Sequence, residues 1–272
     1  MKVAIIGGGT MGEAIASSLI RKGVTQAQNI VVSDLVQERL KYLKDTHHVK
    51  VIERNSEAAK QGQVVIMAVK PQVLQQAMAE LVGIIRPNQL VLSIVAGATI
   101  DTIRKGLGHD AVVRSIPNTP AQIGQGISVW AATGTVNPIQ RDMARQILGA
   151  LGKEIYVTEE KYVDMATAIS GSGPAYVFLF LEAFIDAAVH IGFQRPMAQE
   201  LALQTVLGSA MFMEKSGKHP AELRNMVTTP GGTTVEGLQA LESAGLRAAM
   251  VKAAVAAYEK SRTLGSEKGS AI

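Results

Sequence analysis

The stretch Met1-Lys-Val-Ala-Ile-Ile-Gly-Gly-Gly-Thr-Met-Gly12 sets the fold class of this chain. Its apolar, β-branched start predicts a buried strand, and the amphipathic segment 13–22 predicts a helix. Gly7, Gly9 and Gly12 occupy the positions of a G-x-G-x-x-G turn, which allows a tight turn, close backbone approach to a pyrophosphate and helix–strand packing. The stretch therefore predicts a strand and a helix whose amino end faces phosphates.

A second β-branched segment, 29–33, strengthens this interpretation. It ends in Asp34, which lies 22 residues after Gly12. The acid that binds the adenosine ribose of a dinucleotide follows the third glycine by ~20 residues. Glycine turns without any ligand also exist, but this spacing favours a dinucleotide-binding site.

Composition excludes several classes of protein. The chain of 272 residues has no cysteine, so it has no disulfides, no thiolate metal sites and no cysteine nucleophile, and we expect a reducing cytoplasm. The net charge is +4, but Lys and Arg are scattered and a single tryptophan is present, so we expect no nucleic-acid partner. The apolar stretch 165–181 contains glycines and a proline at 170–174, which we expect to interrupt a helix, so we expect no membrane span.

Strand and helix patterns alternate as far as residue 160. Further strands are expected at 49–52, 64–69, 90–95, 111–116, 126–131 and 154–158. Turns at 7–12, 68–71, 96–99 and 117–120 each follow a strand. Ligands of open parallel sheets bind outside the carboxyl ends of the strands, so we expect these four turns to meet at one site.

Beyond residue 160 only helical patterns remain. We expect an α/β N-terminal Rossmann domain at 1–160, with a mainly parallel doubly wound sheet, followed by an all-α C-terminal dimerisation domain at 161–272. The expected helices are 162–169, 175–191, 197–215, 220–226, 235–243 and 246–264.

The segment 175–191 is apolar around most of its circumference, which predicts cover by a second subunit and hence a homo-oligomer held through the C-terminal helices. Its one polar stripe consists of Glu182, Asp186 and His190. Such a stripe is more often solvated than metal-binding, so we expect no metal site.

Two glycine-rich motifs punctuate the helical domain: Ser170-Gly-Ser-Gly-Pro-Ala-Tyr176 and Thr229-Pro-Gly-Gly-Thr-Thr234. Consecutive glycines before a helix can expose N–H groups that bind an anion, and a substrate carboxylate suits the second motif. The alternative is that its glycines and threonines serve only as turn and helix cap.

These motifs, together with Ala68-Val-Lys-Pro71 and Pro117-Asn-Thr-Pro120, closely resemble those of pyrroline-5-carboxylate reductases along nearly the whole chain. The resemblance implies reduction of a cyclic imino acid, 1-pyrroline-5-carboxylate, to L-proline with NADPH or NADH, the last step of proline biosynthesis. It also implies a homodimer through the C-terminal helices, in some members assembled into a ring of dimers.

Taken with the fingerprint, the resemblance implies cofactor-binding residues Ile6, Gly7, Gly8, Gly9, Thr10, Met11, Gly12, Asp34, Asn55, Ala68, Val69, Lys70, Pro71 and Ala96. For the substrate we expect Glu160, Ser170, Gly171, Gly232, Thr233 and Thr234.

A protonated imine carbon is already electrophilic, so the enzyme mainly has to align it, hold its carboxylate and exclude water. Amides around Gly232 and Thr233 are expected to hold the carboxylate, and the Thr234 hydroxyl is the expected catalytic group, bonded to the ring nitrogen. Lys70 is an alternative proton donor, although backbone contacts are favoured there.

Three alternatives stay open at this point. Asp34 would repel the 2′-phosphate of NADPH, while Ser33 and Arg39 could offset that repulsion, so the coenzyme preference is undecided. A β-hydroxyacid dehydrogenase would need a lysine after the second glycine motif, and none occurs between Lys161 and Lys215. A nicotinamide-binding regulator without turnover would leave the motif at 229–234 without a purpose.

Overall fold

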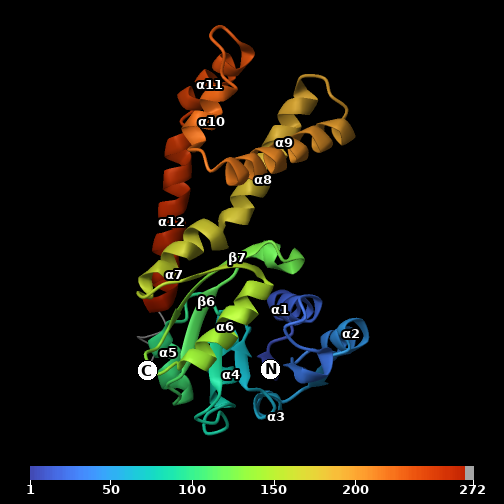
Figure 1. Cartoon of the computed structure of the whole chain (residues 1–272), viewed down its shortest axis with the longest axis vertical. Helices are drawn as coiled ribbons and strands as arrows, with labels where there is room; N and C mark the ends of the chain where they lie inside the picture. Colours follow the sequence, from blue (N-terminus) through green and yellow to red (C-terminus); the bar gives the residue numbers. More distant parts are fainter. Residues whose placement is uncertain (267–272) are drawn as a thin grey trace. The chain divides into compact units, whose positions relative to one another are not determined.

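The computed structural model describes residues 1–266 (Figure 1). Its eight strands form one sheet in the order β3-β2-β1-β4-β5-β6-β7-β8. Neighbours from β3 to β6 are parallel, β7 is antiparallel to β6, and β8 is parallel to β7. The order from β3 to β6 is that of a doubly wound dinucleotide-binding sheet, which confirms the expected fold class.

The strands are β1 (Val3–Ile6), β2 (Ile30–Ser33), β3 (Lys50–Ile52), β4 (Val64–Met67), β5 (Leu90–Ser93), β6 (Val112–Ile116), β7 (Gly126–Ala132) and β8 (Gly152–Tyr156). The helices of this part are α1 (Thr10–Arg21), α2 (Gln37–His47), α3 (Asn55–Ala59), α4 (Leu74–Ala79), α5 (Ile100–Leu107), α6 (Pro138–Ala150) and α7 (Lys161–Ala166). Short turns of helix are η1 (Ala27–Asn29), η2 (Pro71–Val73), η3 (Thr119–Ile123) and the π-helical η4 (Thr167–Gly171).

Helices cover both faces of the sheet (Figure 1). Val3 and Ile5 of β1 face a core that includes α1, α2 and α6, whereas Ala4 and Ile6 face a core that includes α3, α4 and α5. Both faces of the central strands are therefore buried, which explains why β1, β4 and β5 are apolar almost without interruption.

The chain divides into two compact units, Met1–Pro174 together with the chain from Ala256 onward, and Ala175–Val255. The boundary predicted at residue 160 follows the change of sequence pattern. In the structure α7 belongs to the same compact unit as the sheet, because Val163 is 1% exposed and packs with Ile116 and Val129.

The interruption expected at 170–174 is present but short. The α-helix α7 passes into the π-turn η4, which ends at Gly171, Ser172 is a bend, and α8 (Gly173–His190) begins directly after it. The Thr167 hydroxyl donates to the carbonyl of Val163, and the Ser170 hydroxyl donates to that of Ala166, each at 3.0 Å. Pro174 lies in the first turn of α8, where its missing N–H costs little.

The segment Lys161–His190 is accordingly the one helix among residues 1–266 that is long and apolar enough to cross a membrane, with a mean hydropathy of 1.4. A single helix of this kind is weak evidence, because an apolar helix at a subunit interface has the same composition.

The second unit contains α9 (Arg195–Ser216), α10 (Pro220–Met226), α11 (Thr233–Ser243) and parts of α8 and α12 (Leu246–Ser266). Large apolar side chains are exposed on it: Phe178 and Leu179 of α8 are 63% and 66% exposed, and Leu203 and Leu207 of α9 are 53% and 51% exposed. Apolar surface of this extent is typical of a protein–protein interface.

Candidate active site

The glycine turn after β1 has the geometry of a dinucleotide-binding turn. Gly7 has a φ of +104°, and a Cβ there would lie 2.7 Å from the carbonyl oxygen of Ala68. A Cβ on Gly12 would lie 2.0 Å from the carbonyl oxygen of Gly7. A Cβ on Gly9 would meet no atom within 4 Å, so space is open beyond it. The turn fits a pyrophosphate against the first amides of α1, which have no intrahelical acceptor.

A cleft of about 260 Å³ lies at the carboxyl ends of β1, β2 and β4. Among its lining residues are seven that the sequence predicts for the coenzyme: Gly7, Gly9, Asp34, Asn55, Ala68, Val69 and Lys70. Four neighbouring parallel strands, β1, β4, β5 and β6, bring the turns at 7–12, 68–71, 96–99 and 117–120 to the same edge of the sheet, as expected.

The other predicted coenzyme residues do not line this cleft. Ile6 is fully buried, and Gly8 and Gly12 are buried as well, so these three shape the turn from within. The other predicted coenzyme residues that do not line the cleft are at least partly exposed: Thr10, Met11, Pro71 and Ala96.

Asp34 follows β2 at the mouth of the cleft, and backbone amides hold its carboxylate in place. One oxygen accepts from the N–H of Gly8 at 2.8 Å, and the other accepts from the N–H of Val36 at 2.9 Å. The acid predicted from its spacing to Gly12 is therefore bonded directly to the glycine turn.

Asn55 also lies in the cleft, but its side-chain amide has two protein partners. The Ser33 hydroxyl donates to its Oδ1, and its Nδ2 donates to a carboxylate oxygen of Glu80, both at 2.8 Å. Glu80, which directly follows α4, was not predicted, because no sequence motif links it to Asn55.

Glu13 of α1 is another charged residue that the analysis missed. Its carboxylate pairs with Arg39 and accepts from the Tyr42 hydroxyl at 3.1 Å, while Nε2 of His47 lies 2.9 Å away. Burial raises the pKa of Glu13, but hydrogen bonds from His47, Arg39 and Tyr42 outweigh burial, so its pKa lies below 4.5. The cluster ties α1 to α2 beside the glycine turn.

Glu160, predicted for the substrate, belongs to a buried ionic network. Its Oε1 accepts from Nη1 of Arg114 at 2.6 Å and from the backbone N–H of Ile100 at 2.8 Å. Arg114 also pairs with Asp164 of α7. Arg114 was not predicted, although an arginine in the mostly apolar strand 111–116 is itself a signal of a buried ionic group.

The motif at 229–234 forms a turn before α11. Gly231 has a φ of +68°, and the amide of Gly232 donates to the carbonyl of Thr229 at 3.0 Å. That amide is therefore already paired, whereas Thr233 and Thr234 occupy the first turn of α11, where helix amides lack intrahelical acceptors. The helix begins two residues earlier than the position predicted from the sequence, 235.

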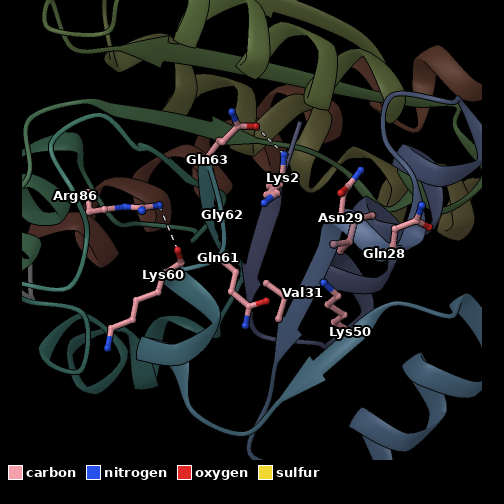
Figure 2. A pocket seen from close by; sticks show the side chains of 11 residues that line it. Lys2, Gln28, Asn29, Val31, Lys50, Lys60, Gln61, Gly62, Gln63 and Arg86 are labelled. Carbon is pink, nitrogen blue, oxygen red and sulfur yellow. Dashed lines mark hydrogen bonds between the residues drawn. The ribbon is translucent and has the colours of Figure 1, made fainter.

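A second cleft, of about 400 Å³, lies at the opposite edge of the sheet, where β1, β2 and β4 begin. Figure 2 shows Arg86 donating to the carbonyl of Lys60 and the amide of Lys2 donating to Gln63, at 3.2 and 2.8 Å. These contacts satisfy backbone groups at the start of the strands, and no residue predicted for coenzyme or substrate lines this cleft.

The structure shows no cluster of three His, Asp or Glu side chains in residues 1–266 that could hold a metal ion. In the stripe considered above, Asp186 instead pairs with Arg195 at 2.8 Å.

Comparisons with known proteins agree with this geometry. A family model for pyrroline-5-carboxylate reductase dimerisation matches residues 160–264, and one described as NADP oxidoreductase, coenzyme F420-dependent, matches residues 2–97. A pyrroline-5-carboxylate reductase of Synechocystis is 43% identical over 98% of this chain and 99% of its own length.

Solved structures give the same result. A pyrroline-5-carboxylate reductase from Coxiella burnetii has a TM-score of 0.89 and 35% identity, covering 97% of this chain and 98% of that one. A pyrroline carboxylate reductase from Plasmodium falciparum, solved with NADP bound, has a TM-score of 0.90 and 30% identity over the same shares of the two chains.

A doubly wound sheet with an open glycine turn, joined to a helical dimerisation region, defines an oxidoreductase that uses a nicotinamide dinucleotide. Relatives of known activity match this architecture along almost their whole length. The chain belongs to the pyrroline-5-carboxylate reductase family, and it reduces 1-pyrroline-5-carboxylate to L-proline with hydride from NAD(P)H. The predictions of family, reaction and cofactor are confirmed.

Proposed function

We propose that the coenzyme lies across the cleft at the carboxyl ends of β1, β2 and β4. The amides from Gly9 to Met11 bind the pyrophosphate, while Ile6, Gly7, Gly8 and Gly12 shape the turn, since the amides of Gly7 and Gly8 already donate to Ser33 and Asp34. The open space beyond Gly9 is the observation that carries this placement, because a close-packed turn would leave no room for phosphates.

The same placement assigns the remaining coenzyme contacts. Asp34 takes the adenosine ribose, and Asn55 takes the adenosine. The nicotinamide half lies against Ala96 and the segment 68–71, where the backbone of Lys70 is extended before Pro71.

NAD(P)H supplies a hydride when bound, and the protein has to present the imine carbon to it. We assign the substrate carboxylate to the first-turn amides of α11, at Thr233 and Thr234. The dipole of this helix of 11 residues favours an anion at its amino end. A Cβ on Gly232 would lie 2.5 Å from Thr229 Oγ1, so glycine keeps the turn before these amides closed on Thr229.

The Thr234 hydroxyl is the proposed catalytic group. It bonds the ring nitrogen and holds the adjacent carbon in line for hydride transfer, which requires orientation more than proton transfer. Thr234 is half-buried while Thr233 is exposed, which favours Thr234 as the residue that contacts a substrate shielded from water.

Glu160, Ser170 and Gly171 are the other residues that we propose to contact the substrate. Ser170 and Gly171 lie in the π-turn η4, and π-turns occur frequently at functional sites. A Cβ on Gly171 would be in ordinary van der Waals contact with Ile116 of β6, 3.6 Å away, so this residue lies against the end of the strand that precedes the turn at 117–120.

Replacement of Thr234 tests the role of its hydroxyl. Thr234→Ala should lower kcat/KM for pyrroline-5-carboxylate on the order of 10²-fold, measured as loss of NADH absorbance, because one transition-state hydrogen bond is lost. Thr234→Ser should restore most of the rate. Thr135→Ala, whose hydroxyl donates to the Asp110 carbonyl in the sheet domain, is the matched control. Full activity of Thr234→Ala would disprove the assignment.

The match to a dimerisation model identifies residues 160–264 as the dimerisation region, and we propose that the dimers associate into rings. The apolar segment 161–190 lies within that match, so a subunit interface accounts for its surface without a membrane. We also propose that the enzyme is cytoplasmic and has no nucleic-acid partner. Mass photometry of the purified enzyme tests the ring, and a dimer as the largest species would contradict it.

A further inference from the structure

The carboxylate of Asp34 is poised to receive a ribose diol. A carboxylate has about four lone-pair sites, and the amides of Gly8 and Val36 use one on each oxygen. One site on each oxygen remains, which matches two neighbouring hydroxyls. The same two oxygens would face a 2′-phosphate with like charge, which is unfavourable at such short range.

Arg39 is the cation that could offset this repulsion, but two of its three nitrogens already have partners. Its Nε donates to the carbonyl oxygen of Gly8 at 2.5 Å, and its Nη2 pairs with Glu13. Both side chains are about three-quarters buried, at 27% and 23% exposure, which strengthens their pairing. To turn its Nε and Nη2 toward a phosphate, the guanidinium would have to leave a carboxylate that Tyr42 and His47 hold in place.

The other groups at this end of the cleft do not favour a phosphate either. The Ser33 hydroxyl already donates to Asn55, and the Asn55 amide donates to Glu80. Glu80 adds a second carboxylate to the lining, and the one cation among the lining residues, Lys70, follows β4 on the proposed nicotinamide side.

We propose that this enzyme selects NADH over NADPH, and that Glu13 determines this selectivity together with Asp34 by holding Arg39 away from the ribose. The Asp34 carboxylate repels the 2′-phosphate of NADPH, and Glu13 keeps the positive charge of Arg39 paired. The inference rests on the proposed placement of the adenosine ribose at Asp34. Glu13 is a positioning residue here, since it acts on the coenzyme only through Arg39.

Binding measurements on the full-length enzyme test the selectivity for NADH and the role of Asp34 in it. Dissociation constants for NADH and NADPH, from coenzyme fluorescence without substrate, should differ roughly tenfold or more in favour of NADH. Asp34→Ser should lower the ratio of the NADPH constant to the NADH constant roughly tenfold, and Asp34→Asn should lower it as well while keeping the side-chain shape. Equal constants in the wild type, or an unchanged ratio in both variants, would overturn the proposal.

A mutant cycle tests the role of Glu13. Adding Glu13→Gln to Asp34→Ser should strengthen NADPH binding a further several-fold, because Arg39 is released. Adding Arg39→Ala to that double variant should remove the gain, which a merely structural role of Glu13 would not predict. Glu38→Gln, an exposed carboxylate in the first turn of α2, is the matched control and should leave the ratio unchanged. If Glu13→Gln adds nothing, or if Arg39→Ala leaves the gain intact, the role of Glu13 is wrong.

Probes that lack nicotinamide separate this inference from the placement on which it depends. ADP-ribose and its 2′-phosphate derivative should show the same order of affinities by calorimetry. If Gly9→Ala weakens ADP-ribose binding while the Asp34 variants leave the ratio unchanged, the coenzyme site stands and the selectivity proposal fails. If neither position affects binding, the placement itself is wrong.

Discussion

Nη1 of Arg114 donates to Oε1 of Glu160 at 2.6 Å, and this bond links a central strand of the sheet to the start of α7. The Arg114 side chain is 3% exposed, and Asp164 is its second partner. Glu160 also accepts from the amide of Ile100, the first residue of α5. The turn at 96–99, which leads into α5, is therefore anchored by the residue that precedes α7.

Loss of the Arg114 side chain should destabilise the sheet domain. Arg114→Met leaves two carboxylates without their partner, and because both are partly exposed we expect a loss of about 2 kcal/mol, less than for a fully buried pair. Urea unfolding followed by the fluorescence of Trp130, the single tryptophan, measures this change. Arg104→Met breaks an exposed pair with Asp110 and should cost much less, because water screens an exposed ion pair. Equal losses in the two variants would contradict the argument.

Alanine substitutions at two glycines of the first turn should have different effects, one on stability and the other on coenzyme binding. Gly12→Ala places a methyl group 2.0 Å from the Gly7 carbonyl oxygen, so the backbone must shift, and the free energy of unfolding should fall by ~1–3 kcal/mol. Gly9→Ala points into open space, so stability should change by less than ~0.5 kcal/mol while the NADH dissociation constant rises roughly tenfold. Thermal unfolding and fluorescence titration check both. A Gly9→Ala variant with normal affinity for NADH would show that the pyrophosphate does not bind beside Gly9.

The Glu13 cluster should make stability depend on pH in the acid range. The pKa of Glu13 is lower in the folded protein than its ordinary value of 4.5, so folding favours the carboxylate. The stabilisation is therefore fully present above pH 4.5 and is lost as the pH falls through the folded pKa. The melting temperature of the wild type should exceed that of Glu13→Gln at pH 6, and the difference should shrink below pH 4.5. A difference that grew on acidification would refute this account.

The exposed face of α8 should be required for dimerisation. Leu179 is 66% exposed in the single chain, and Leu179→Asp would place a charge in the interface that the dimerisation region forms. Light scattering should show a shift from a dimer or larger assembly toward the 28.8 kDa subunit. Ile139→Asp, on a 70% exposed residue of α6, is the control and should keep the wild-type mass. An unchanged mass of Leu179→Asp would exclude this face from the interface.

The sequence determined the architecture because its signals are local. The β-branched start of the chain, the three glycines and the distance from Gly12 to Asp34 are properties of residues close in sequence. They predicted the strand, the glycine turn and an acid held at that turn. The four turns could be placed at one edge because parallel strands leave no other arrangement. The helix break expected at 170–174 is present only at Ser172, since glycine and proline frequencies do not reveal the preceding π-turn, in which hydroxyls bond to carbonyls.

Only the tertiary structure decided which charged groups are free to act. Glu13 and Arg39 are 26 residues apart, and Arg114 and Glu160 are 46 apart, so no local pattern reveals that each pair is bonded. Arg39 looks like a phosphate ligand in the sequence, whereas in the fold it is held by Glu13 and the Gly8 carbonyl. A side chain's chemistry is set by its residue type, but its availability depends on partners that only folding brings within hydrogen-bonding distance.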